Sequence, residues 1–94
     1  MLSQIPIELD KVDKKDINKE ILRIAIIAEL DAVSLYEQLA SKTDNKDIKA
    51  ILLDVAKEEK THVGEFQALL LKEDPQQVKE LEAGKKEVEK ELSK

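Results

Sequence analysis

One glutamate and the only histidine of the chain lie three residues apart inside an apolar segment of a predicted helix. The segment is KEEKTHVGEF, residues 57–66, and the two residues are Glu59 and His62. With about 100° of rotation per helical residue, both side chains fall within one apolar stripe, formed with Ile48, Leu52, Val55, Phe66 and Leu70. A third polar residue, Glu29, occupies the middle of the apolar stripe of an earlier predicted helix. Carboxylate and imidazole groups suit iron, manganese and zinc, so the three residues predict a metal site.

The two predicted helices bring Glu29 and Glu59 opposite each other. They cover residues 13–41 and 47–73, and the turn KTDNK joins them as an antiparallel hairpin whose midpoint, Asp44, lies midway between the two glutamates. Two facing carboxylates taken out of water are costly without a compensating charge, and neither stripe carries a lysine. A bound cation resolves this conflict. The alternative is a structural cluster in which His62 is an ordinary core residue.

The ligand count predicts a homodimer. Di-iron carboxylate bundles use a glutamate from each of two helices and a Glu-x-x-His pair from each of the other two. This chain supplies Glu29 and the pair Glu59 and His62, which is half of that set. A two-fold dimer would complete it, and its four carboxylates would balance two divalent cations. The predicted fold class is therefore all-α, with a hairpin that dimerises into a four-helix bundle.

The rest of the chain is predicted to form less regular or weaker elements within a single domain, 1–94. Residues 1–12 are expected to form an extended arm. The pair Asp74-Pro75 ends the second helix, because a residue before proline avoids the helical region. A short C-terminal helix is predicted over 76–92, with its apolar residues on one side and a charge load that favours light packing.

Composition excludes several classes of function. The net charge of −5 argues against a nucleic-acid partner. The absence of cysteine excludes disulfides, thiolate zinc sites and iron–sulfur clusters, and one histidine is too few for a hemerythrin-type oxygen carrier. No apolar run approaches the roughly 20 residues of a membrane span, and no signal peptide is recognisable at the start. These features predict a cytoplasmic protein with no membrane partner.

Two blocks of the sequence, AELDAVSLYEQLA at 28–40 and ILLDVAKEEKTHVGEF at 51–66, resemble the encapsulated ferritins, short ferritin-like proteins housed in encapsulin nanocompartments. The resemblance implies a ferroxidase that oxidises Fe(II) with dioxygen at a di-iron centre across a dimer interface, for iron storage or detoxification. It implies Glu29, Glu59 and His62 as metal ligands and Tyr36 as the tyrosine near the centre. It also implies two iron ions per dimer, a ring of five dimers and an encapsulin shell as partner.

The resemblance has departures and leaves alternatives. Family members carry further acids where iron enters, whereas here Ala28 precedes Glu29 and Asp31 is the remaining acid of that group. A tryptophan common before the tyrosine is replaced by Leu35. Manganese or zinc could substitute for iron. The alternative functions are a rubrerythrin-like peroxidase, another di-metal enzyme such as a manganese catalase, or a metal-free helical interaction module.

Overall fold

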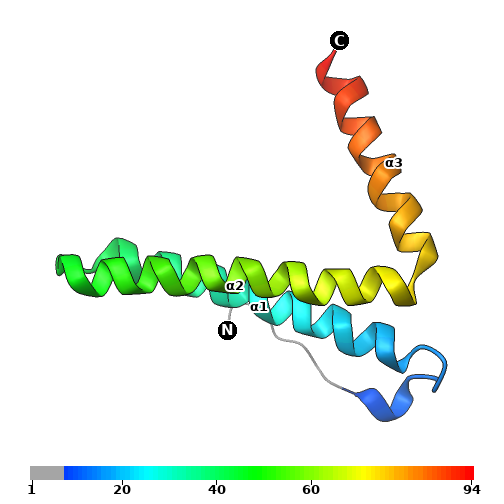
Figure 1. The fold of residues 1–94 in the computed structure, drawn as a ribbon, viewed down its shortest axis with the longest axis horizontal. Coiled ribbons are helices and arrows are strands. Elements are labelled where there is room, and N and C mark those ends of the chain that lie inside the picture. Colours follow the sequence, from blue (N-terminus) through cyan, green and yellow to red (C-terminus); the bar gives the residue numbers. More distant parts are fainter. Residues whose placement is uncertain (1–7) are drawn as a thin grey trace.

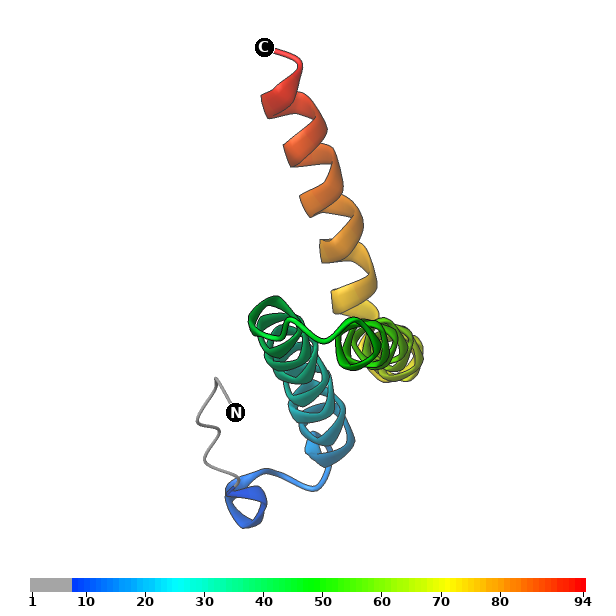
Figure 2. The same cartoon turned by 90° about the vertical axis from the view of Figure 1, so that its left-hand side faces the viewer.

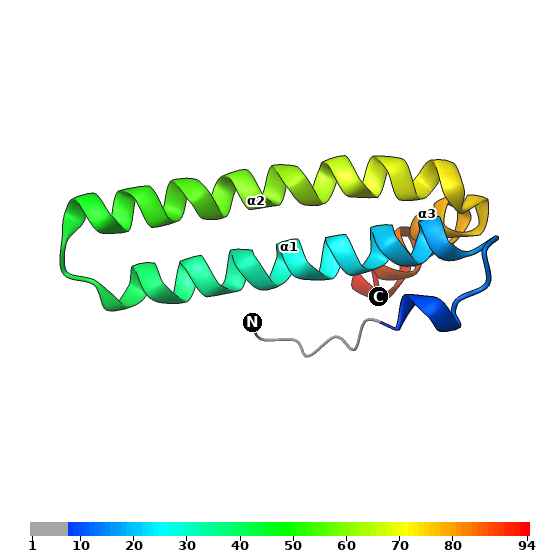
Figure 3. The ribbon, with the colours of Figure 1, turned by 90° about the horizontal axis from the view of Figure 1, so that it is seen from below.

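The computed structural model describes residues 8–94 and consists there of helices joined by short connections. A single 3-10 turn, η1 (Leu9–Lys11), precedes three α-helices. They are α1 (Ile17–Lys42), α2 (Lys46–Glu73) and α3 (Pro75–Leu92). Helices α1 and α2 lie antiparallel along their length (Figure 1, Figure 3). The predicted all-α class and the predicted hairpin are confirmed.

The hairpin turn is fixed by a side-chain cap. Oδ1 of Asn45 accepts hydrogen bonds from the backbone N–H groups of Asp47 and Ile48, each at 3.0 Å. These are donors that the first turn of an α-helix otherwise leaves unpaired. The cap fixes where α2 begins after a connection of three residues, and α1 and α2 then bring Glu29 and Glu59 close together.

The hairpin has a small core. In the described part of the chain, the buried apolar residues are Val33, Ala40, Ala56 and Leu70. Many large apolar side chains remain exposed, at 38% or more of their surface; they include Ile21, Leu39, Ile48, Ile51 and Leu69. An exposed apolar surface of this extent is typical of a chain that packs against a partner.

Helix α3 leaves the hairpin instead of folding back onto it (Figure 1, Figure 2). None of its residues is buried. Val78, Leu81, Val88 and Leu92, the apolar residues predicted on one side, are 45%, 44%, 58% and 80% exposed. The predicted light packing of this helix is therefore borne out within the chain.

The observed helix bounds differ from the predicted ones mainly at the start of the chain. Helix α1 begins at Ile17 rather than at 13, because Asp13 to Asp16 form a turn whose backbone bond joins the Asp16 N–H to the Asp13 carbonyl oxygen. The expected extended arm over 1–12 contains η1, so its described part is not extended throughout. The remainder of the arm lies outside the described residues. Helices α2 and α3 each begin one residue earlier than predicted.

Among residues 8–94, no helix has the length and apolarity needed to cross a membrane.

Candidate metal centre

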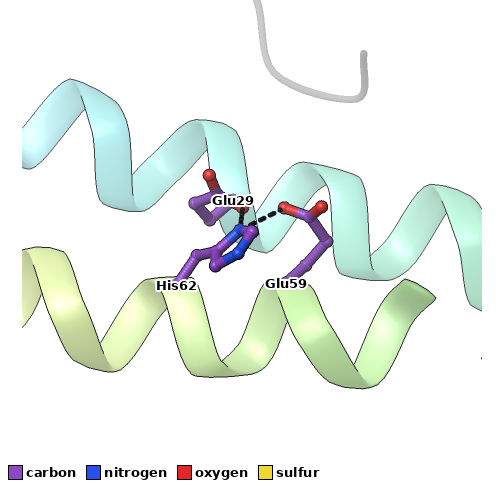
Figure 4. A group of neighbouring side chains, drawn as sticks. All are labelled: Glu29, Glu59 and His62. Carbon is purple, nitrogen blue, oxygen red and sulfur yellow. Dashed lines mark ion pairs between the residues drawn. The ribbon is translucent and has the colours of Figure 1, made fainter. Parts of the chain in front are cut away.

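The three residues singled out by the sequence converge between the two helices of the hairpin. Glu29 projects from α1, and Glu59 and His62 project from successive turns of α2 (Figure 4). One ligand atom from each residue lies within 4.8 Å of the other two. Among residues 8–94 this is the group of histidine and acidic side chains arranged to hold a metal ion.

The imidazole lies between the two carboxylates. Nδ1 of His62 is 3.4 Å from Oε2 of Glu29 and 3.4 Å from Oε2 of Glu59. Oε2 of Glu29 is buried and has no hydrogen-bond partner in the described structure. A buried acceptor without a partner costs about 1–3 kcal/mol, and more when it is charged. Within the hairpin this oxygen has the 3.4 Å ion-pair contact with His62, which is charged only when the imidazole is protonated, and a cation would give it a further partner.

The spacing of the donor atoms fits a metal ion. Bonds of about 2.1 Å to an octahedral cation place neighbouring donors about 3 Å apart and opposite donors about 4.2 Å apart. The observed separations, 3.4 Å between Nδ1 of His62 and each carboxylate and at most 4.8 Å within the group, are somewhat longer than these values. The chemistry of the donor set, two carboxylates and one imidazole, suits iron, manganese or zinc.

The centre is open on one side. The side chains of Glu29 and Glu59 are 20% and 19% exposed, and that of His62 is 43% exposed. A metal bound here would have protein donors from the hairpin and free positions facing outward. The group therefore has the form of a half-site on the surface of the chain.

The other two sequence-predicted site residues lie outside this group. Tyr36 is half-buried on α1, two helical turns beyond Glu29 towards the hairpin turn. Asp31 is only 7% exposed and has an interaction within the chain, so it does not present an open carboxylate to solvent. The roles assigned to Tyr36 near the metals and to Asp31 where iron enters stay predictions.

A buried carboxylate, to which the sequence assigned no role beyond ending the second helix, lies at the joint between α2 and α3. Asp74 is 8% exposed. Its Oδ1 accepts the backbone N–H of Gln77 at 3.1 Å, and its Oδ2 accepts Nη2 of Arg23 at 3.0 Å. The Gln77 hydrogen bond lowers the pKa of the Asp74 carboxyl, burial opposes this, and the charges of Arg23 and Lys19 add to the lowering. The cap could have been predicted from the sequence, because an acid directly before a proline is a common start of a helix. No sequence pattern indicated that Arg23 on α1 would be the second partner of Asp74.

Comparison with known proteins places these features in a family. The rubrerythrin family matches residues 20–93, which include all three residues of the candidate metal centre. Among solved structures, the encapsulated ferritin domain from Pyrococcus furiosus is 55% identical, with a TM-score of 0.82. That match covers 96% of this chain and 94% of the other.

Two curated relatives are longer than this chain. A ferritin-like-encapsulin shell fusion protein from Pyrococcus furiosus is 58% identical over 99% of this chain, which spans 27% of that protein. The encapsulin nanocompartment cargo protein EncC from Myxococcus xanthus is 46% identical over 60% of this chain, and the match spans 43% of that protein.

Proposed function

The chain belongs to the rubrerythrin family and, within it, to the encapsulated ferritins, and from that premise we propose that it is a ferroxidase. The proposed reaction oxidises Fe(II) to Fe(III) with dioxygen at a di-iron centre that two copies of the chain complete together. Iron is the substrate, destined for storage or detoxification inside an encapsulin nanocompartment. Manganese or zinc can occupy the same donors, since carboxylate and imidazole ligation does not select among these metals.

The observation that carries this proposal is the unsatisfied oxygen of Glu29 within a half-set of ligands. Oε2 of Glu29 is buried without a hydrogen-bond partner, beside His62 and close to Glu59. A cation would satisfy this oxygen directly. Two Glu and one His are half of the ligand set of a di-iron bundle, and a two-fold axis at the centre would supply the other half.

The exposed apolar side chains of the hairpin support such an axis, because they lie at similar distances on either side of the centre. Towards the turn, α2 exposes Ile48 and Ile51, eleven and eight residues before Glu59. Towards the open end, α1 exposes Ile21 and α2 exposes Leu69, eight residues before Glu29 and ten after Glu59. At about 1.5 Å per residue both patches lie roughly 12–16 Å from the centre.

A two-fold axis perpendicular to the hairpin would then lay the turn end of one copy on the open end of the other. Each apolar patch would cover the partner's opposite patch, and the two half-sites would meet in the middle. This matches the self-complementary surface that a two-fold interface requires. Burial of both patches would also supply the core that the isolated hairpin lacks.

The proposed chemistry uses the charge of the donor set. Two Fe(II) ions each give one electron to dioxygen, so the products are two Fe(III) ions and oxygen reduced by two electrons. The four carboxylates of the dimer favour Fe(III), because it is the harder and more highly charged ion. His62 would contribute one imidazole donor to each ion. By resemblance, the Tyr36 hydroxyl lies beside the centre.

The compartment is proposed from the relatives. The names of the two curated relatives place one in fusion with an encapsulin shell and the other as encapsulin cargo. We extend this to the present chain: it assembles as a homodimer, forms higher rings of dimers and works inside an encapsulin shell. Its iron product would then pass to the interior of that shell.

The test is the rate of Fe(II) oxidation by dioxygen, followed by the absorbance of the ferric product after mixing anaerobic Fe(II)-loaded protein with air-saturated buffer. His62→Ala should abolish rapid oxidation. Glu65→Gln is the matched control, because Glu65 is an exposed acid on α2, three residues from His62 and outside the ligand group. Equal rates in the wild type and His62→Ala would refute the proposal.

The same preparation separates the rival functions. Faster turnover of hydrogen peroxide than of dioxygen would favour a rubrerythrin-like peroxidase, and peroxide disproportionation by the manganese form would favour a catalase. A dimer that binds no metal at all, shown by native mass spectrometry, would favour a helical interaction module.

A further inference from the structure

The Asp74 carboxylate connects all three α-helices. It follows the last residue of α2, and its Oδ1 caps the first turn of α3 through the Gln77 N–H. Its Oδ2 accepts a hydrogen bond from the guanidinium of Arg23, a residue of α1 that lies 51 positions earlier in the sequence. Both oxygens of this buried side chain are therefore occupied, one by α3 and one by α1.

Few other contacts hold α3. It has no buried residue, and its large apolar residues remain at least 44% exposed. The helix projects from the end of the hairpin (Figure 2). Within one copy of the described chain, α3 lacks packing along its length, so its direction there depends on the short joint at its start.

We propose that the ion pair between Arg23 and Asp74 is a positioning latch that fixes the direction of α3 relative to the hairpin. The cap hydrogen bond sets where α3 begins, and the guanidinium sets how the carboxylate, and with it the first turn, is oriented on α1. Charge-assisted bonds of this kind are shorter and stronger than neutral ones, and 3.0 Å is a direct contact. The latch thereby determines the direction in which the apolar side of α3 is presented. This inference is independent of the proposed ferroxidase activity.

The surroundings of Arg23 agree with this assignment. Its second guanidinium nitrogen, Nη1, lies 3.7 Å from Oε2 of Glu20, one turn earlier on α1. The side chain is 47% exposed, so its methylene stem and charge are placed by these two acids and not by burial in a core. Substitution of Arg23 should therefore leave the hairpin folded.

The test measures the distance between spin labels on the hairpin and on α3. The chain has no cysteine, so Ser41→Cys and Ser93→Cys provide two unique labelling positions near the hairpin turn and at the end of α3. The full chain is used, and dilution with unlabelled protein restricts the signal to distances within one copy. The expected wild-type result is one narrow distance distribution.

Two variants remove the ion pair of the latch and keep the cap of α3. Arg23→Gln removes the charge from α1 and leaves the cap intact. Asp74→Asn keeps a good capping side chain and removes the charge at the joint. Each should broaden the distribution roughly twofold or more, since a helix held only by its backbone joint samples several directions. Arg23→Lys should restore part of the narrow distribution, because it retains the charge but not the forked geometry.

Lys60→Gln is the control. It breaks the exposed ion pair with Glu37, which also links α2 to α1, at 3.2 Å and far from the joint. Its distribution should match the wild type, and circular dichroism should show the same helix content in every variant. An unchanged narrow distribution in both Arg23→Gln and Asp74→Asn would overturn the proposal.

Discussion

Two carboxylates of this small protein, Asp74 and Glu29, lie where helices meet, and their oxygens are partnered in opposite ways. At the joint of α2 and α3, both oxygens of Asp74 are bonded within the chain, by Gln77 and by Arg23. At the centre of the hairpin, Oε2 of Glu29 is buried without a hydrogen-bond partner, with the His62 ring nitrogen 3.4 Å away.

We interpret the difference as that between a structural acid, Asp74, and a candidate ligand-binding acid, Glu29. A carboxylate whose lone pairs are used by its own chain gains stability from those bonds and has little left to offer a ligand. A carboxylate that remains unsatisfied after folding costs stability, and an external cation can recover that cost. The comparison predicts opposite responses of the two sites to substitution, metal and pH.

The largest expected difference is in activity. Glu29→Ala should slow Fe(II) oxidation by at least about a hundredfold. Loss of a residue that only hydrogen-bonds to a metal ligand already lowers metal affinity or activity about 10–100-fold, and loss of the ligand itself is more severe. Asp74→Asn should leave the rate within about twofold, since distant sites act independently. Stopped-flow absorbance of the ferric product measures both. A similar loss of rate in the two variants would remove the distinction between the sites.

The next effect is stabilisation by metal. Mn(II), a redox-stable probe in this assay, should raise the free energy of unfolding by about 2.7 kcal/mol when its free concentration is one hundred times its dissociation constant. The gain should persist in Asp74→Asn and vanish in Glu29→Ala. Thermal unfolding by circular dichroism, at one fixed protein concentration and with EDTA as the metal-free reference, provides the measurement. Stabilisation of Glu29→Ala equal to that of the wild type would place the metal elsewhere.

A smaller effect is expected in the metal-free protein. Glu29→Gln should keep or raise the free energy of unfolding, by up to about 1 kcal/mol, because it removes an unsatisfied charge and its amide can donate to Glu59. Asn45→Ala, which removes a satisfied helix cap, should lower it by about 1 kcal/mol. Urea unfolding in EDTA at pH 8 compares the two variants. A clear loss of stability in Glu29→Gln would mean that this oxygen has a structural partner.

The smallest effect is the pH dependence of the joint. The pKa of Asp74 is lowered from its ordinary 3.8, first by the Gln77 hydrogen bond and then by Arg23 and Lys19. A group with a lowered pKa in the folded state stabilises the fold fully above its unfolded pKa, and this contribution is lost as pH falls through the folded value. The stability difference between the wild type and Asp74→Asn should therefore be constant above about pH 5 and shrink on acidification below 3.8. The acid side chain of Glu20 also faces Arg23, so Glu20→Gln serves as the control.

Much of the fold and of the centre was predictable because both depend on local periodicity. The apolar repeat predicted the two long helices, and polar residues predicted the turn KTDNK and the break at Asp74. The register of the hairpin then placed Glu29 opposite Glu59, and the structure brings both to His62. The ligand roles and the dimer that would complete them stay predictions, because they depend on a metal and a second copy.

The latch was not predictable in the same way. The register that places Glu29 level with Glu59 places Arg23 level with Glu65, well before Asp74 in α2. Only the reach of the guanidinium and the path of the chain at the end of α2 bring Arg23 to the carboxylate at 3.0 Å.

The sequence by itself determined which segments are helical, where they turn and which polar residues interrupt the apolar stripes. These properties follow from rotation per residue and from capping chemistry, which act over a few neighbouring positions. Tertiary structure decided the direction of α3, the ion pair between Arg23 and Asp74 and the unsatisfied oxygen of Glu29. Those depend on distances and burial between segments far apart in the chain, which no local pattern encodes.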